Sequence, residues 1–128
     1  AIKERQDVLF NDLASRSPGV HFKNMIGLSS IAKIYLANRI DCFISHYATD
    51  SIYPSAICRK PGVVFISPSI SKQQRDLHVH HNVIEVPSEK VNDIDDGSGA
   101  KGWGQTSISM SWKDVYSCLI QVINKKSL

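Results

Sequence analysis

Six consecutive residues, His46-Tyr47-Ala48-Thr49-Asp50-Ser51, concentrate hydrogen-bonding side chains directly after a short apolar segment. In an open α/β sheet, ligands bind beyond the carboxyl ends of the strands, where a following helix presents free backbone N–H groups to anions. The hydroxyls of Thr49 and Ser51, with the amides of the first helical turn from Asp50, are suited to hold a phosphate. His46 or Tyr47 is suited to contact a sugar or a base. The plainer alternative is that Thr49, Asp50 and Ser51 only cap a helix.

A second candidate segment is Lys23–Gly27, which lies between a predicted strand and a predicted amphipathic helix. Lys23, Asn24 and Ile26 are predicted to line a nucleoside pocket in which backbone groups read the base. As an ordinary loop, the segment would need no ligand. The carboxyl-end rule for parallel strands also selects residues 67–72 and 87–90.

Two other sequence patterns do not meet the requirements of a metal site or a phosphate-binding loop. His78, His80 and His81 form a histidine cluster, but no cysteine or carboxylate at ligand spacing completes a tetrahedral metal set nearby. The glycine-rich residues 97–104 do not follow a strand and lack the Lys-Ser/Thr ending of a phosphate-binding loop. The spacing supports no Ser–His–acid or Cys–His arrangement. The sequence therefore predicts no metal site and leaves the catalytic residues unknown.

Bulk composition describes an ordinary globular chain of 128 residues, with 42% hydrophobic and 21% charged residues and a net charge of +3. The basic residues are scattered, which argues against nucleic-acid binding. Three cysteines, an odd number without CxxC spacing, lie in apolar surroundings and favour a reducing compartment. No apolar run is long enough to span a membrane and no leader is present. We therefore expect a cytoplasmic protein, with peripheral membrane association left open.

Hydrophobic spacing predicts the elements that position these residues. Helices are expected over residues 2–15, 28–36, 51–58 and 112–125, and strands over residues 20–22, 40–44, 63–66 and 82–86. Ser29 or Ser30 is expected to cap the second helix, whose apolar residues fall at i, i+3, i+4, i+7 and i+8, the spacing of a helix with one buried face. Residues 87–110 are expected to form a long connection.

Continuous apolar strands such as Val63–Ile66 indicate a parallel sheet covered on both faces. Strands that alternate with helices at this spacing predict an α/β fold, a Rossmann-like, doubly wound and mainly parallel sheet of about four to five strands. Residues 1–128 are expected to form one such domain. Because the chain begins inside a helix with no strand ahead of it, we expect it to be the C-terminal half of a larger two-domain protein.

With these elements in view, the chain resembles the C-terminal half of GT-B glycosyltransferases, most closely the heptosyltransferase-like enzymes of bacterial surface polysaccharide synthesis. The resemblance covers about half of the chain and extends from Val20 to Pro68, with a further likeness in the closing 109–123 segment. It rests on Gly27-Leu28-Ser29-Ser30-Ile31-Ala32-Lys33, Asp41–Ile44, Thr49, Ser55-Ala56-Ile57 and Lys60-Pro61-Gly62-Val63-Val64-Phe65-Ile66-Ser67-Pro68. In that family the segment corresponding to the elbow contains Asp-Thr-Gly; Thr49 matches, whereas Ala48 and Asp50 differ.

The resemblance implies a donor-binding domain that holds a nucleotide-sugar through the Thr49 elbow and the segment at Lys23. It implies sugar transfer without an obligatory metal or other cofactor. The glycan acceptor and the usual catalytic base would belong to an N-terminal half that is not part of this chain. This half alone would bind nucleotide and turn over nothing.

Two alternatives stay open. The first is a non-enzymatic Rossmann-like module, either a protein-interaction domain or a degenerate transferase half, which the substitution at Asp50 favours. The second is a signalling domain, because Asp41-Cys42-Phe43-Ile44-Ser45-His46 resembles the opening strand of TIR domains. Those domains begin at that strand, whereas here some 40 residues precede it.

Overall fold

The parallel strands are the centre of the computed structural model, which describes residues 2–17, 19–47, 51–68, 83–94 and 107–126. The helices are α1 (Ile2–Arg16), α2 (Ser30–Ala37), the π-helix η1 (Ile52–Ile57), the 3₁₀ turn η2 (Ser88–Lys90) and α5 (Trp112–Lys126). The strands are β1 (Phe43–His46), β2 (Gly62–Phe65), β3 (Val83–Glu85), β4 (Asn92–Ile94) and β5 (Ser107–Ser109). The chain is therefore an α/β protein, as predicted.

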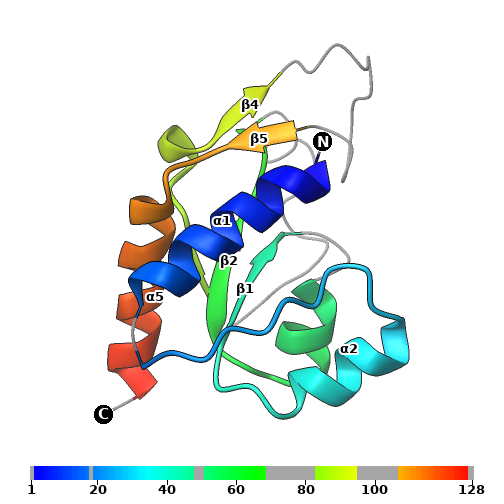
Figure 1. Cartoon of the computed structure of the whole chain (residues 1–128). Coiled ribbons are helices and arrows are strands. Elements are labelled where there is room, and N and C mark those ends of the chain that lie inside the picture. The colour runs from blue at the N-terminus through cyan, green and yellow to red at the C-terminus, as the bar shows by residue number, and fades with distance from the viewer. Residues whose placement is uncertain (1, 18, 48–50, 69–82, 95–106, 127–128) are drawn as a thin grey trace.

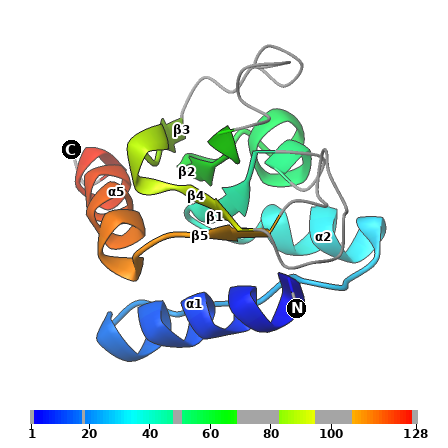
Figure 2. The same ribbon diagram turned by 90° about the horizontal axis from the view of Figure 1, so that it is seen from above.

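Strands β1, β2 and β3 form a three-stranded parallel sheet in that order, and β4 pairs with β5 in a separate antiparallel hairpin. Helices α1 and α5 lie on one side of the parallel sheet, and α2 and η1 lie on the other (Figure 1, Figure 2). Of the expected mainly parallel sheet of about four to five strands, the described residues show a parallel sheet of three strands. Residues 92–94 and 107–109, expected within a long connection, pair as the hairpin instead.

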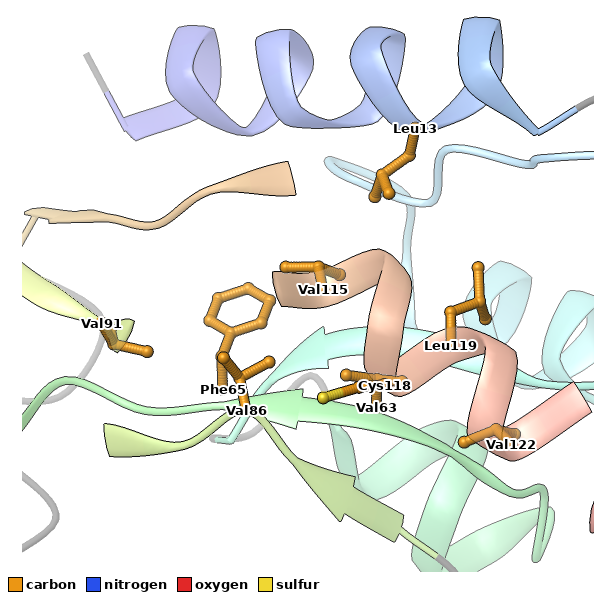
Figure 3. Close-up of a cluster of buried hydrophobic side chains, with 9 residues drawn as sticks. All are labelled: Leu13, Val63, Phe65, Val86, Val91, Val115, Cys118, Leu119 and Val122. Atoms are coloured by element: carbon orange, nitrogen blue, oxygen red, sulfur yellow. The ribbon is translucent and has the colours of Figure 1, made fainter. Parts of the chain in front are cut away.

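The larger hydrophobic core joins α1, α5 and one face of the sheet. In Figure 3, Leu13 reaches from α1 toward α5, which contributes Val115 and Leu119 above the side chains of Val63 and Phe65. All of these residues are at most 6% exposed. The predicted apolar face of the last helix is therefore confirmed.

A smaller core covers the opposite face, where Phe43 and Tyr47 pack with Val64 and Ile66. Successive side chains of a strand point to opposite faces, so β2 supplies Val63 and Phe65 to one core and Val64 to the other. All four residues of β2 are buried. The prediction that this apolar run is covered on both faces is confirmed.

Three boundaries differ from the sequence-based expectation. Residues 20–22 form no strand, and the first parallel strand begins at Phe43 rather than Ile40. The predicted helix over residues 51–58 is a six-residue π-helix. Pro54 lies in its first turn, where a missing N–H removes no intrahelical hydrogen bond, so the proline does not by itself exclude an α-helix. In an α-helix the Cys58 N–H would donate to the carbonyl four residues earlier. The Cys58 N–H instead donates to the Tyr53 carbonyl five residues earlier, at an N···O distance of 3.1 Å.

Arg59 ends η1 in the left-handed region, with φ of 54°. This conformation favours glycine, because Cβ crowds the backbone there. We expect Arg59→Gly to raise the free energy of unfolding by about 0.5–1 kcal/mol, measured by urea denaturation. Arg59→Ala is the matched control, since it removes the charge and keeps Cβ, and it should give no gain. Equal stabilisation by both variants would contradict this explanation.

Candidate functional site

The carboxyl ends of β1 and β2 lie level, because His46 pairs with Phe65 in the parallel register. The Tyr47 N–H continues this pairing by donating to the Phe65 carbonyl at 2.8 Å. The elbow therefore leaves the sheet beside the segment that follows β2, as the carboxyl-end rule predicts. The two strands, β1 and β2, run in the same direction (Figure 1).

His46 and Tyr47 have different surroundings at this edge. The His46 ring is half-buried and stands edge-on to the Phe65 ring, with centroids 5.5 Å apart and an interplanar angle of 84°. The Tyr47 side chain is 8% exposed and belongs to the smaller core. Packing thus accounts for Tyr47, and His46 is the more accessible of these two predicted ligand contacts.

The elbow itself is described only at its two ends, since Thr49 and Asp50 lie outside the described residues. Ser51 is fully buried and precedes η1, but its side chain makes no capping hydrogen bond. The alternative that Ser51 caps this helix with its side chain is therefore wrong. The short η1 also carries a smaller dipole than the eight-residue helix that the sequence predicted.

Two side-chain hydrogen bonds near the candidate site were not predicted from the sequence. The buried Ser67 hydroxyl donates to Asp93 Oδ1, which ties β4 of the hairpin to the end of β2. The Ser30 and Tyr53 hydroxyls are 2.9 Å apart and join the start of α2 to η1. The carboxyl-end rule had selected Ser67 by position. Nothing in the sequence indicated its partner, which lies 26 residues away.

The Lys23–Gly27 segment is an ordered turn. Asn24 Oδ1 accepts the Ile26 N–H at 3.0 Å, and Gly27 adopts a φ of 81°, which suits glycine. Ser29 then caps α2 by accepting the Ala32 N–H at 3.2 Å. The predicted cap is confirmed, and local hydrogen bonding accounts for Asn24 without a ligand.

A groove of about 510 Å³ lies between this turn and α2. Lys23 and Asn24 line it from the turn, and Leu28, Ile31, Tyr35 and Leu36 line it from the helical side. The apolar spacing of residues 28–36 predicts that this helical face is buried. This expectation is wrong, because Ile31 is 82% exposed and Tyr35 57% exposed.

The predicted site residues therefore fall into two groups. Lys23 and Asn24 line the groove along α2, and Ile26 is 40% exposed on the same turn. His46, Tyr47 and Ser51 lie at the sheet edge, and none of these three lines the groove. The Ser30–Tyr53 contact connects the elements that carry the two groups.

Cys42, Cys58 and Cys118 are free thiols, and Cys118 on α5 is buried. Burial, reinforced by the nearby Asp114 carboxylate, raises the pKa of the Cys118 thiol above its ordinary value of 9.0. The unfolded chain therefore loses this proton at lower pH than the folded chain. The stability that results is fully present below pH 9 and is lost as the pH rises through the folded-state pKa.

We accordingly expect the melting temperature of the wild type to fall more between pH 7 and pH 10 than that of Cys118→Ala. Alanine preserves a small apolar side chain and removes the titrating group. Thermal unfolding followed by circular dichroism at both pH values measures the difference. Parallel melting curves for the two proteins across this range would contradict the assigned cause.

No group of three or more His, Cys, Asp or Glu side chains within the described ranges is arranged to hold a metal ion. His78, His80 and His81 fall outside those ranges. None of the helices in the described part of the chain is both long and apolar enough to cross a membrane. Comparison of the chain with protein-family models, curated proteins and solved structures finds no match.

Proposed function

We propose that this chain binds a nucleotide-sugar at the carboxyl edge of β1 and β2, as the donor-binding part of a GT-B-like glycosyltransferase. The observation that carries the proposal is the level ending of these two parallel strands at His46 and Phe65, followed at once by the hydroxyl-rich elbow. Ligands of open α/β sheets bind at this position. The finer fold assignment, a doubly wound Rossmann-like domain, is part of the same proposal.

In this proposal the elbow holds the diphosphate through the Thr49 hydroxyl and neighbouring backbone amides. His46 contacts the sugar or the base beside the Phe65 ring. The elbow amides stabilise the leaving diphosphate, which is electrostatic stabilisation of the kind that replaces a metal cation. The acceptor and the catalytic base come from a second domain, and the reaction belongs to bacterial glycan synthesis.

Titration of the ¹⁵N-labelled chain with uridine and adenosine diphosphates tests the proposal. We expect saturable amide shifts at residues 46–51. Thr49→Val removes one hydroxyl and keeps the shape, so it should weaken binding about 2- to 10-fold, the value of one hydrogen bond. Ser15→Ala on α1, whose exposed hydroxyl donates to the Asp12 carbonyl at 3.1 Å, is the matched control.

The absence of any saturable shift at residues 46–51 with millimolar nucleotide would overturn the proposal. The second candidate is then a non-enzymatic binding module with the same fold. One observation favours it: η1 spans only Ile52–Ile57 and offers a weak dipole to a diphosphate. The same titration separates the two candidates, because an interaction module predicts no nucleotide dependence.

A further inference from the structure

The outward face of α2 exposes large apolar side chains to solvent. We call the groove between the Lys23–Gly27 turn and this face the α2 groove. Its apolar wall consists of Leu28, Ile31, Tyr35 and Leu36. The side chain of Ile31 is 82% exposed. Single exposed apolar residues are common, but a contiguous group around a hollow marks a binding surface.

The charged residues on the Lys23–Gly27 turn and on α2, which form the α2 groove, are basic. Between Asp12 and Asp41 the sequence contains no acidic residue and four basic ones, Arg16, Lys23, Lys33 and Arg39. Lys23 lines the groove and Arg39 stacks on the ring of its Tyr35, whereas Arg16 lies over the Trp112 ring and Lys33 over the Tyr53 ring. A positive surface of this kind steers and selects negatively charged partners.

Arg39 and Tyr35 form a preorganised pair at the end of the groove. The guanidinium carbon of Arg39 lies 3.6 Å from the centroid of the Tyr35 ring, and Arg39 Nη1 donates to the Tyr35 carbonyl at 3.0 Å. Tyr35 is nevertheless 57% exposed. Tyrosine and arginine are the residues enriched at the energetic centres of protein interfaces, where little side-chain entropy remains to be lost.

We propose that the α2 groove docks an amphipathic helix of a partner protein, with acidic residues flanking its apolar ridge. The groove residues on α2, Ile31, Tyr35 and Leu36, recur at helical spacing. The apolar ridge of a second helix can therefore pack into the groove between them. Eight residues of α2 extend about 12 Å, which corresponds to about two turns of the partner. Acidic side chains on its flanks would face Lys23 and Arg39.

Other occupants fit less well. A nucleotide would need several convergent polar groups. Besides apolar side chains, the described lining offers Lys23, Asn24, Ser29 and the Tyr35 hydroxyl, and Asn24 and Ser29 already accept hydrogen bonds from nearby backbone amides. A lipid surface is flat, and this surface is hollow. The proposal is independent of nucleotide binding, since neither His46 nor Ser51 lines the groove.

Two synthetic 18-residue peptides test the proposal. Both carry leucine at i, i+3, i+4 and i+7 spacing on an alanine background; one has glutamate on both flanks and the other has lysine. Fluorescence anisotropy at low salt should show saturable binding of the glutamate peptide, at least tenfold tighter than the lysine peptide. Lys23→Glu combined with Arg39→Glu should reverse this preference.

The variant Ile31→Ser should weaken binding of the glutamate peptide at least fivefold. Its matched control is Val8→Ser on α1, which replaces another exposed aliphatic side chain, 60% exposed, away from the groove. Since Ile31 is mostly in solvent, circular dichroism of Ile31→Ser should match the wild type. An equal effect of both substitutions would overturn the assignment of the surface.

Three further results would overturn the proposal. The first is no saturable binding of the glutamate peptide, or equal binding of both peptides. The second is sedimentation of the chain with phosphatidylserine vesicles that Ile31→Ser abolishes, which would make a lipid surface the occupant. The third is a dimer in analytical ultracentrifugation that Ile31→Ser converts to monomer, which would make a second copy the occupant.

Discussion

Replacement of Gly62 by alanine is expected to destabilise the protein by about 1–3 kcal/mol, the usual cost of overpacking a core. Gly62 opens β2 and pairs with Phe43 of β1. A Cβ built on Gly62 would overlap the ring of Phe43, which is itself only 7% exposed. The ring cannot move away without disturbing the smaller core, because that core is packed around it. Urea denaturation of the two proteins measures the change.

A double-mutant cycle with Phe43→Leu separates this overlap from a general effect of the added methyl group. Leucine is smaller than phenylalanine and leaves room near Gly62. The Gly62→Ala substitution should therefore cost less in the Phe43→Leu background than in the wild type, with a coupling energy of about 1 kcal/mol. An identical cost in both backgrounds would show that the Phe43 ring is not the obstacle.

Leu119→Ala should lower the free energy of unfolding by about 2–5 kcal/mol, the range found for deletion of a buried leucine side chain. Leu119 is 2% exposed on α5 and belongs to the larger core, where α5 packs against β2 and β3. The loss combines the transfer of apolar atoms with the cavity that remains between helix and sheet. Thermal and urea unfolding give the magnitude.

The control for this prediction lies two residues further along the same helix. Gln121 is exposed, so Gln121→Ala should change stability by less than about 0.5 kcal/mol. Both substitutions introduce alanine into α5, which makes their helix propensity effects similar in kind. A Leu119→Ala cost no larger than that of Gln121→Ala would mean that α5 does not close the core.

These two large effects fall on elements that the sequence predicted well. The run Val63–Ile66 is apolar at every position, which identified it as a strand buried on both faces, and the spacing of Val115, Leu119 and Val122 located the last helix. Ser29 was recognisable as a cap because its hydroxyl bonds an amide only three residues away. Each of these features depends on neighbours close in sequence.

The errors occurred where distant residues decide the outcome. The face of α2 has the spacing of a core helix, yet Ile31 and Tyr35 point outward. Periodicity shows that a helix has an apolar face but does not show what covers it. The Ser67–Asp93 bond and the hairpin β4–β5 likewise join residues far apart in the chain.

The candidate site divides in the same way. Its position at the end of the first parallel strand followed from chain order, because parallel strands place their carboxyl ends at one edge. The sequence by itself thus determined the α/β class, the doubly covered strand β2 and the cap at Ser29. Only the tertiary structure decided that Tyr47 packs inward, that Lys23 borders a groove rather than the elbow, and that the apolar face of α2 is exposed. The physical reason is that local propensities act over a few residues, whereas burial depends on which surfaces meet.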